Sequence, residues 1–250
     1  MPGDLYRTAG RRALLLTMRL DGYLSRCSGL SRKEARLAVR AGRVTINGER
    51  AGKASLMVPG QAVVALDGEP VALPQHLYLM LNKPAGVLSA TTDASQPVVS
   101  DLLPGDLAPR VHPVGRLDSD TTGLLLMSSD GQWSHRITSP RHHCPKTYRV
   151  TLAEAMTEAG LEQLRQGLHL RHDDTPTRPA EVRPLSDRVI DLTITEGRYH
   201  QVKRMLAAVG NHVEALHRHR IGPVTLDPTL APGHFRHLSE QEVRGLAMPE

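Results

Sequence analysis

Three observations predict an α+β protein of two domains. At 250 residues, the chain exceeds the roughly 100–200 residues of a usual single domain. In its larger C-terminal part, strand-like apolar runs outnumber helical segments and do not alternate strictly with them, which favours a mostly antiparallel sheet. The stretch Pro70–Pro74 is typical of a linker between these runs and a small basic module. We expect domains at residues 18–75 and 76–250, with residues 1–17 as a disordered extension or as sequence upstream of the true start.

The composition excludes several classes of protein. Hydrophobic residues make up 40% of the chain and charged residues 23%, so wholesale disorder is not expected. No apolar run approaches the roughly 20 residues that span a bilayer. The run Ala13–Leu16 is too short for the core of a signal peptide. The two cysteines, Cys27 and Cys144, do not make a disulfide framework in a chain of this length. We expect a cytoplasmic protein with no membrane partner.

The net charge of +5 is concentrated near the N-terminus. Residues 18–75 hold nine Lys and Arg against five Asp and Glu, and residues 1–17 hold three Arg against one Asp, so the rest of the chain is close to neutral. A small basic module of this kind is typical of a domain that binds the phosphates of a nucleic acid. A solvated basic face explains the same count, and charge alone does not separate the two.

Residues 18–75 show the pattern of two helices followed by short strands. Apolar residues recur at helical spacing from Leu20 to Cys27. The capping box Ser31–Glu34 begins a second helix, which Gly42 ends. Strands are expected at 44–46 and 63–66, each followed by a hairpin-type Asn-Gly or Asp-Gly turn.

The second helix also predicts a surface that contacts RNA. Four of its basic residues fall within roughly 100° of arc at 3.6 residues per turn. With one arginine just beyond the helix and one lysine in the larger domain, the candidate RNA-binding residues are Arg32, Lys33, Arg36, Arg40, Arg43 and Lys83.

The larger domain is predicted to combine a sheet with three helices. Strands are expected at 77–81, 124–127, 148–152 and 189–194. Helices are expected at 161–168, at 198–209 with Gly210 at its end, and after a capping box at 239–242.

The loop His112–Gly123 is the first candidate for chemistry. It sets Arg116, Asp118 and Asp120 between glycines and directly before a core strand, a position that holds side chains rigidly. A plain turn with Asp side chains bonded to the backbone explains the same residues. Two carboxylates two residues apart also allow a metal site, although few hard ligands surround them. Spacing alone leaves these interpretations open.

Two more residues are candidates for contacts with a substrate. Lys203 is expected at the edge of the apolar stripe of the 198–209 helix, where it could keep a carboxylate ionised or lay its stem along the core with its head in water. His200 and Arg204 are expected on the far side of that helix. Tyr148 begins a strand among basic residues and could stack on a base or pack in the core with its hydroxyl bonded.

The run Arg141–Cys144 contains two histidines and a cysteine but is a weak zinc signal, because no second pair of ligands accompanies it. We expect a plain loop or a nucleic-acid contact there, and no metal site in the chain.

Five motifs follow one another along the chain. They are Leu81–Gly86 (LNKPAG), Gly115–Leu125 (GRLDSDTTGLL), Asp130–Cys144 (DGQWSHRITSPRHHC), Lys146–Tyr148 (KTY) and Glu196–Met205 (EGRYHQVKRM). Together they resemble the pseudouridine synthases, and among these the RsuA-type ribosomal small subunit enzymes. The resemblance covers the chain from about Met18 to the C-terminus. It implies a small α/β S4-like RNA-binding domain followed by a pseudouridine synthase domain with a mostly antiparallel sheet.

The resemblance also implies roles for four residues. Asp118 matches the catalytic aspartate of the family and Arg116 the arginine beside it. Tyr148 matches the tyrosine that stacks against the target base. Lys203 falls where the family has a basic partner for the aspartate. Many relatives carry arginine there, and a lysine makes a point contact instead of a bidentate one.

The implied reaction turns a uridine of 16S rRNA, uridine 516, into pseudouridine. It involves no redox step and no group transfer, so no cofactor is expected. The expected partner is small-subunit ribosomal RNA, within a pre-ribosomal particle, bound by a monomer. Two alternatives remain: an RNA-binding or ribosome-assembly protein without catalysis, and a sister synthase that acts on 23S rRNA.

Overall fold

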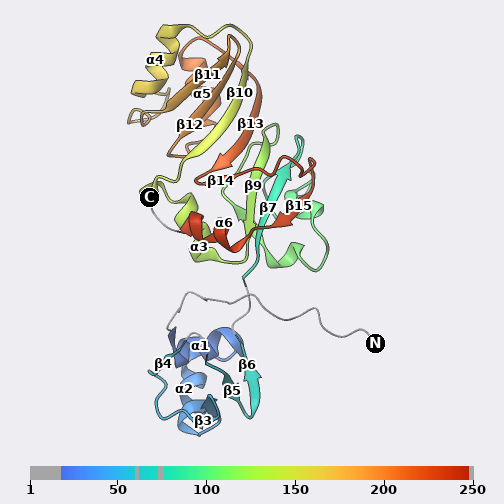
Figure 1. Ribbon diagram of the computed structural model, residues 1–250, viewed down its shortest axis with the longest axis vertical. Helices are drawn as coiled ribbons and strands as arrows, with labels where there is room; N and C mark the ends of the chain where they lie inside the picture. The colour runs from blue at the N-terminus through green and yellow to red at the C-terminus, as the bar shows by residue number, and fades with distance from the viewer. Residues whose placement is uncertain (1–17, 60–61, 73–75, 248–250) are drawn as a thin grey trace. The chain divides into compact units, whose positions relative to one another are not determined.

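The computed structural model describes residues 18–59, 62–72 and 76–247. By its contacts the chain divides into two compact units, Met1–Gln75 and His76–Glu250 (Figure 1). The expected extension, residues 1–17, lies outside the described residues.

Two helices contribute to the apolar core of the first unit. They are α1 (Leu20–Cys27) and α2 (Arg32–Arg40), in agreement with the predicted periodicity. The capping box is confirmed: the Ser31 hydroxyl accepts from the Glu34 amide at 3.3 Å, and the Glu34 carboxylate accepts from the Ser31 amide at 2.7 Å. Leu20 and Leu24 are fully buried in this core.

Short strands complete the first unit. β1 (Met18–Arg19) pairs with β4 (Met57–Val58), and a four-stranded antiparallel sheet runs in the order β3 (Glu49–Arg50), β2 (Val44–Ile46), β5 (Val64–Leu66) and β6 (Glu69–Val71). Both predicted turns have two residues of positive φ, as type I′ hairpins require. The linker prediction was wrong at Pro70 and Val71, which lie in the edge strand β6. The missing amide donor of Pro70 is tolerated in an edge strand. Residues 73–75 lie outside the described residues.

Asp21 joins the two helices of this unit through a buried ion pair. Its side chain is only 1% exposed, and its carboxylate accepts from Arg19 Nη2 at 3.1 Å and from Arg36 Nε at 3.0 Å. The hydrogen bond from Arg19 lowers the pKa of Asp21 to about 2, against the opposing effect of burial, and Arg36 adds to the lowering. Arg36, predicted to contact RNA, therefore also holds α2 to α1.

A single nine-stranded sheet organises the second unit, and its pairs are antiparallel with one exception. Its main path runs β11 (Glu181–Ser186), β12 (Val189–Ile194), β10 (Lys146–Leu152), β13 (Val213–Ile221), β9 (Thr122–Ser128), β7 (Tyr78–Lys83) and β15 (Phe235–His237). β8 (His112–Val114) adds to β9, and β14 (Val224–Thr225) adds to β13. This confirms the predicted α+β class with a mostly antiparallel sheet.

The one parallel pair joins β13 to β9 in the middle of the sheet, with His217 opposite Thr122 and Arg218 opposite Gly123. Gly123 has a φ of +101°, and a Cβ there would lie 2.3 Å from the carbonyl oxygen of Arg218. Only glycine allows the two backbones this close. The pair places the chain before β9 next to the first half of β13.

The two faces of the sheet are covered by different helices (Figure 1). α4 (Glu158–Gln166) and α5 (Gln201–Ala208) supply residues to one apolar cluster, and α3 (Gly131–Thr138) and α6 (Glu240–Ala247) supply residues to the other. The 3-10 helices are Val99–Leu102, Ala108–Arg110 and Pro140–His142. Among the described residues, no helix combines the length and apolarity needed to cross a bilayer.

The predicted strands and helices are present with shifted ends, but some elements were missed. α3 has only eight residues. Asp130 is its N-cap, and the Asp130 carboxylate accepts hydrogen bonds from the amides of Gln132 and Trp133. The short apolar pattern of α3, with Trp133 and Ile137 buried, is too weak to predict a helix. β13 was missed because Arg218 and two histidines interrupt its apolar residues.

Lys83 at the end of β7 fastens the loop before β9. It is 0% exposed, and its Nζ donates to the carbonyl oxygens of Pro84 at 2.9 Å, Ser119 at 3.1 Å and Thr121 at 2.8 Å. Burial lowers the pKa of Lys83 to about 8, with Asp120 and Asp118 opposing the shift. The expectation that Lys83 contacts RNA was therefore wrong, because its ammonium is enclosed and bonded to the backbone.

The Asp21 ion pair predicts an acid-dependent stability of the first unit. At pH 7, Asp21→Asn should lower the free energy of unfolding of the first unit by about 1–2 kcal/mol. The loss is smaller than the pKa shift of Asp21 alone implies, because both arginines are half-exposed and solvent screens their charges. The folded pKa lies below the unfolded one, so this stability is present above pH 3.8 and is lost as the pH falls toward 2. Hydrogen exchange of α1 and α2 along a urea series would measure it. Asp67→Asn is the control, because the Arg43–Asp67 pair is exposed and asparagine suits the φ of +55°. Equal losses in both variants would contradict the prediction.

The Lys83 contacts predict that this side chain stabilises the loop before β9. Lys83→Met keeps the length of the side chain but leaves buried carbonyl groups without a donor, which should destabilise the second unit by about 1–3 kcal/mol in urea unfolding. Lys146→Met is the matched control, since Lys146 Nζ donates to a single carbonyl, that of Cys144. A Lys83→Met protein as stable as the wild type would rule out this role.

Candidate active site

Asp118 lies in the loop between β8 and β9, on the wall of a cavity of about 740 Å³. Its side chain is 31% exposed. The backbone around it is fixed on both sides: the Ser89 hydroxyl accepts from the Leu117 amide at 3.0 Å and donates to its carbonyl at 2.8 Å, and the Gly86 amide donates to Ser119 at 2.7 Å. The loop therefore holds the carboxylate in place through its main chain.

The start of α5 forms the facing wall of the cavity. α5 directly precedes β13, whose parallel pairing with β9 brings this helix beside the Asp118 loop. His200 Nε2 lies 3.4 Å from Asp118 Oδ1, and Lys203 Nζ lies 3.6 Å from Asp118 Oδ2. Each oxygen of Asp118 thus faces a different basic side chain.

Lys203 makes its hydrogen bonds to Asp120 instead of Asp118. Its Nζ lies 2.7 Å from both carboxylate oxygens of Asp120, and these bonds lower the pKa of Asp120. The expectation that Lys203 is a basic partner of Asp118 agrees with their ion pair at 3.6 Å, and the structure adds that the hydrogen bonds of the ammonium go to Asp120. At 3.6 Å its charge still acts on Asp118, while Asp120 holds the ammonium in place.

His200 was expected on the far side of the helix and lies instead against Asp118. α5 begins at Gln201, because His200 has a left-handed backbone with φ 47° and precedes the helix. A helical projection that begins at Arg198 therefore misplaces the residue. The only sequence signal was the motif around it, since no helical spacing predicts a left-handed histidine.

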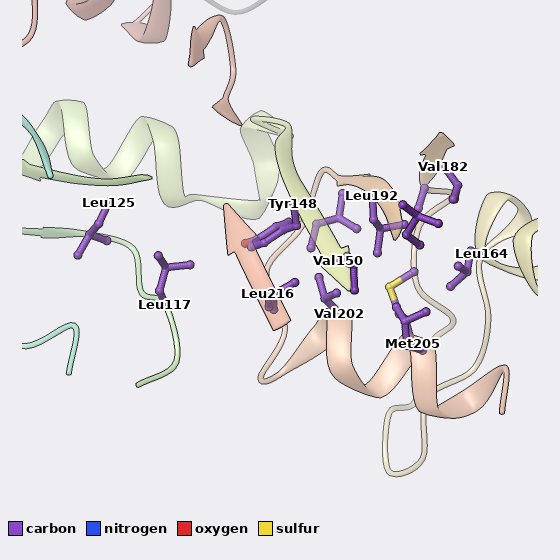
Figure 2. Packing of buried hydrophobic residues seen from close by; sticks show 14 of the residues in the cluster. Leu117, Leu125, Tyr148, Val150, Leu164, Val182, Leu192, Val202, Met205 and Leu216 are labelled. Atoms are coloured by element: carbon purple, nitrogen blue, oxygen red, sulfur yellow. The ribbon is translucent and has the colours of Figure 1, made fainter. Parts of the chain in front are cut away.

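Tyr148 on β10 lines the same cavity and belongs to the apolar core. It is 8% exposed, and its ring lies near Leu216, while Val202 and Met205 of α5 pack against the same cluster (Figure 2). The ring is packed in the core, as one interpretation of this tyrosine expects, and also forms part of the cavity wall; stacking on a base stays a prediction.

A buried cation that the sequence did not suggest completes this wall. Arg218 on β13 is 2% exposed, donates from Nε to the Leu124 carbonyl at 2.8 Å, and lies 3.4 Å from the Tyr148 hydroxyl through Nη1. It forms no ion pair with any carboxylate in the described part of the chain, and its Nη2 has no hydrogen-bond partner there. Lys146, whose pKa burial lowers, lines the cavity beside it. Neither Arg218 nor Lys146 has a carboxylate partner among the residues that the structure describes, so the two side chains make this wall electropositive.

Arg116 is an exposed residue of the cavity rim with no hydrogen bond or ion pair to a described residue. In the first unit, Arg32, Lys33 and Arg40 are likewise exposed and unpaired among the described residues. Arg36 pairs with Asp21, and Arg43 pairs with Asp67 through Nε at 2.7 Å and through a second bond from Nη2. Three of the six predicted RNA-binding residues thus have free charges.

The described residues contain no cluster of three or more histidine, cysteine or acidic side chains arranged for a metal ion. His142 is bonded to the Arg136 carbonyl at 3.0 Å and His143 to Arg178 at 3.0 Å. The segment Arg141–Cys144 is in part the 3-10 helix Pro140–His142 and not a plain loop throughout, and both of its histidines are bonded within the chain.

The arrangement suits chemistry on a flat polar ring. A cavity of this size fits a small organic group. A partly exposed carboxylate can act as a base or as a nucleophile, a tyrosine wall can pack against a ring, and a positive wall favours negative charge that develops on that ring.

Comparison with known proteins agrees with this geometry. The family model of the RNA pseudouridylate synthases matches residues 77–208, and that of the S4 domain matches residues 18–64. A crystal structure of a pseudouridylate synthase, 44% identical, superposes with a TM-score of 0.68 and covers 92% of this chain and 100% of that one.

Two relatives are similar over nearly their whole length. Ribosomal small subunit pseudouridine synthase A of Escherichia coli (strain K12) is 50% identical over 228 residues, 90% of this chain and 98% of the relative. The protein of that name from Haemophilus influenzae is 44% identical over 230 residues, 92% and 99% of the two chains. The chain therefore belongs to the RNA pseudouridylate synthase family, as an RsuA-type pseudouridine synthase with an N-terminal S4 domain.

Proposed function

We propose that this enzyme converts uridine 516 of 16S rRNA to pseudouridine, with Asp118 as the catalytic carboxylate. The position of Asp118 carries the proposal: it lies on a rigid loop, on the wall of a cavity, facing two basic side chains. The small-subunit substrate rests on the names of the relatives, and uridine 516 on the resemblance of the motifs to the RsuA-type enzymes.

The reaction is an isomerisation in which the N1–C1′ bond breaks and a C5–C1′ bond forms. The C5 proton leaves and a proton binds at N1, so the atoms balance and no cofactor takes part. Asp118 acts either by adding to the sugar or base or by removing a proton. Lys203 and His200 each face one oxygen of this carboxylate, at 3.6 Å and 3.4 Å.

The cavity wall suits the binding of the flipped base and the stabilisation of the uracil once its bond to the sugar breaks. A base must leave its stack to reach Asp118, and the flipped base needs a flat surface to pack against, which Tyr148 offers. When the N1–C1′ bond breaks, negative charge develops on the uracil, and the positive charges of Arg218 and Lys146 stabilise it. The free guanidinium of Arg116 at the rim is suited to hold the RNA backbone.

The S4 domain adds affinity for phosphates in this proposal, through Arg32, Lys33 and Arg40. The protein acts in the cytoplasm, as a monomer, on RNA within a pre-ribosomal particle.

Substitution of the two loop carboxylates tests the catalytic assignment. Asp118→Asn should lower the rate of pseudouridine formation at least about a thousandfold, while its affinity for RNA stays within about twofold of the wild-type value. Asp120→Asn is the matched control: it removes the ion pair of Lys203 but not the catalytic carboxylate, so activity should fall by less than about tenfold. The measurement is site-resolved pseudouridine mapping of 16S and 23S rRNA in a deletion strain complemented with each variant.

Modification at uridine 516 that persists with Asp118→Asn would refute the role of Asp118. A lost site in 23S rRNA would show the sister activity instead.

The free cations of the S4 domain predict the salt dependence of RNA binding. Replacing Arg32, Lys33 and Arg40 together by glutamine in the full chain should make the slope of log affinity against log salt shallower by about 2 to 3. Arg43→Gln is the control and should change the slope by much less, since Asp67 already neutralises Arg43. An unchanged slope in the triple variant would mean that the basic helix is a solvated face.

A further inference from the structure

Tyr199 is the most exposed large hydrophobic residue in the described part of the second unit and lines the mouth of the cavity. It is 78% exposed, and its hydroxyl has no hydrogen bond to a described residue. Among the described residues, its one ring contact is with His200: the centroids lie 3.8 Å apart and the planes meet at 18°. One face of the tyrosine is thus covered by a stacked ring and the other is open to solvent.

The backbone that carries this ring pair is braced far more than an ordinary surface loop. Arg198 donates to Asp173 at 2.9 Å and to the carbonyls of Thr175 at 2.7 Å and Pro176 at 2.6 Å. Arg204 bonds Asp173 at 2.6 Å and the Tyr199 carbonyl at 3.3 Å.

Gln201 adds a second set of bonds, to Glu196 at 2.7 Å and from the Arg198 amide at 2.9 Å. His200 is held in a left-handed conformation that a non-glycine residue adopts only when its surroundings require it. These contacts fix the position of Tyr199 but bury little of it. The fold thus holds an exposed aromatic ring in one orientation, as a binding surface requires.

The position of the ring pair identifies its ligand. His200 lies between Tyr199 and Asp118, with its Nε2 3.4 Å from the carboxylate. If the target uridine is at Asp118, the group nearest the open face of Tyr199 is a neighbour of that uridine in the same strand. Exposed aromatic rings bind single-stranded nucleotides by stacking.

We propose that the Tyr199–His200 pair is a stacking platform for the nucleobase next to the target uridine. The inference rests on the proposed function, because it places the target at Asp118. Stacking accepts any base, so this platform adds affinity and register along the strand, and Tyr199 acts as a positioning residue. The arginines that flank it are neutralised by Asp173 and Glu196, so the contact depends on the ring itself.

A double-mutant cycle between protein and RNA tests the platform. The probe is a 16S rRNA fragment that contains the uridine modified by the wild-type protein, either intact or with an abasic nucleotide directly 5′ or 3′ of it. Binding is measured in the Asp118→Asn background, so that turnover does not interfere. Tyr199→Ala should weaken binding of the intact RNA by about 5- to 100-fold, and Tyr199→Phe by no more than about twofold. Leu185→Ala, at another exposed apolar residue of this unit, should have no effect.

The platform is tested by whether the effects of Tyr199→Ala and of the abasic nucleotide on binding depend on each other. An abasic nucleotide at the stacked position should weaken binding to the Tyr199-containing protein by the same factor as Tyr199→Ala, and should weaken Tyr199→Ala no further. Additive losses at both neighbouring positions, or wild-type affinity in Tyr199→Ala, would overturn the platform while leaving the proposed function intact. If the wild-type protein forms no pseudouridine in the RNA, the proposed function fails and this inference fails with it.

Discussion

The parallel pairing of β9 with β13 is the constraint on which the site depends. It is the only parallel pair among the described strands, and it requires Gly123 because the backbones approach too closely for a side chain. The loop before β9 carries Asp118, and the helix before β13 carries Lys203. Residues 85 positions apart in the chain thereby share one cavity wall, and a shift of this pair by one residue would turn alternate side chains away from it.

The loop itself is held by the motif that precedes it. Lys83 binds two of its carbonyls, Gly86 binds one, and Ser89 binds both backbone groups of Leu117. These contacts explain why a lysine is enclosed in the core although burial disfavours its charge. Its ammonium replaces water as the donor to the carbonyls of Pro84 and Thr121, and it shares the Ser119 carbonyl with the Gly86 amide. The result is a rigid main chain under a carboxylate that remains partly open.

Local patterns predicted much of the fold, and the site only in part. Helical spacing and capping boxes predicted α1, α2 and α6, because these features depend on neighbours in sequence. β13 and the buried Arg218 could not be predicted this way, since an arginine in the core depends on a carbonyl of β9 that only the tertiary fold supplies. The same holds for His200, whose left-handed backbone is set by contacts of its neighbours with residues 173–176. The assignment of Asp118 came from the motifs together, because spacing alone fits a turn equally well.

In the proposed function, the two carboxylates of the loop perform different tasks. Both carboxylate oxygens of Asp120 accept hydrogen bonds of 2.7 Å from the Lys203 ammonium and so fix its position. Asp118 receives only the weaker contacts of Lys203 at 3.6 Å and His200 at 3.4 Å. A carboxylate bonded directly to the ammonium would have to break that bond before it could attack or accept a proton. Because Asp120 takes the direct bond, Asp118 keeps the electrostatic benefit of the cation while its oxygens stay available to a substrate. An arginine at position 203 would spread its donors over a fork, whereas the compact ammonium of lysine can serve Asp120 and still lie beside Asp118.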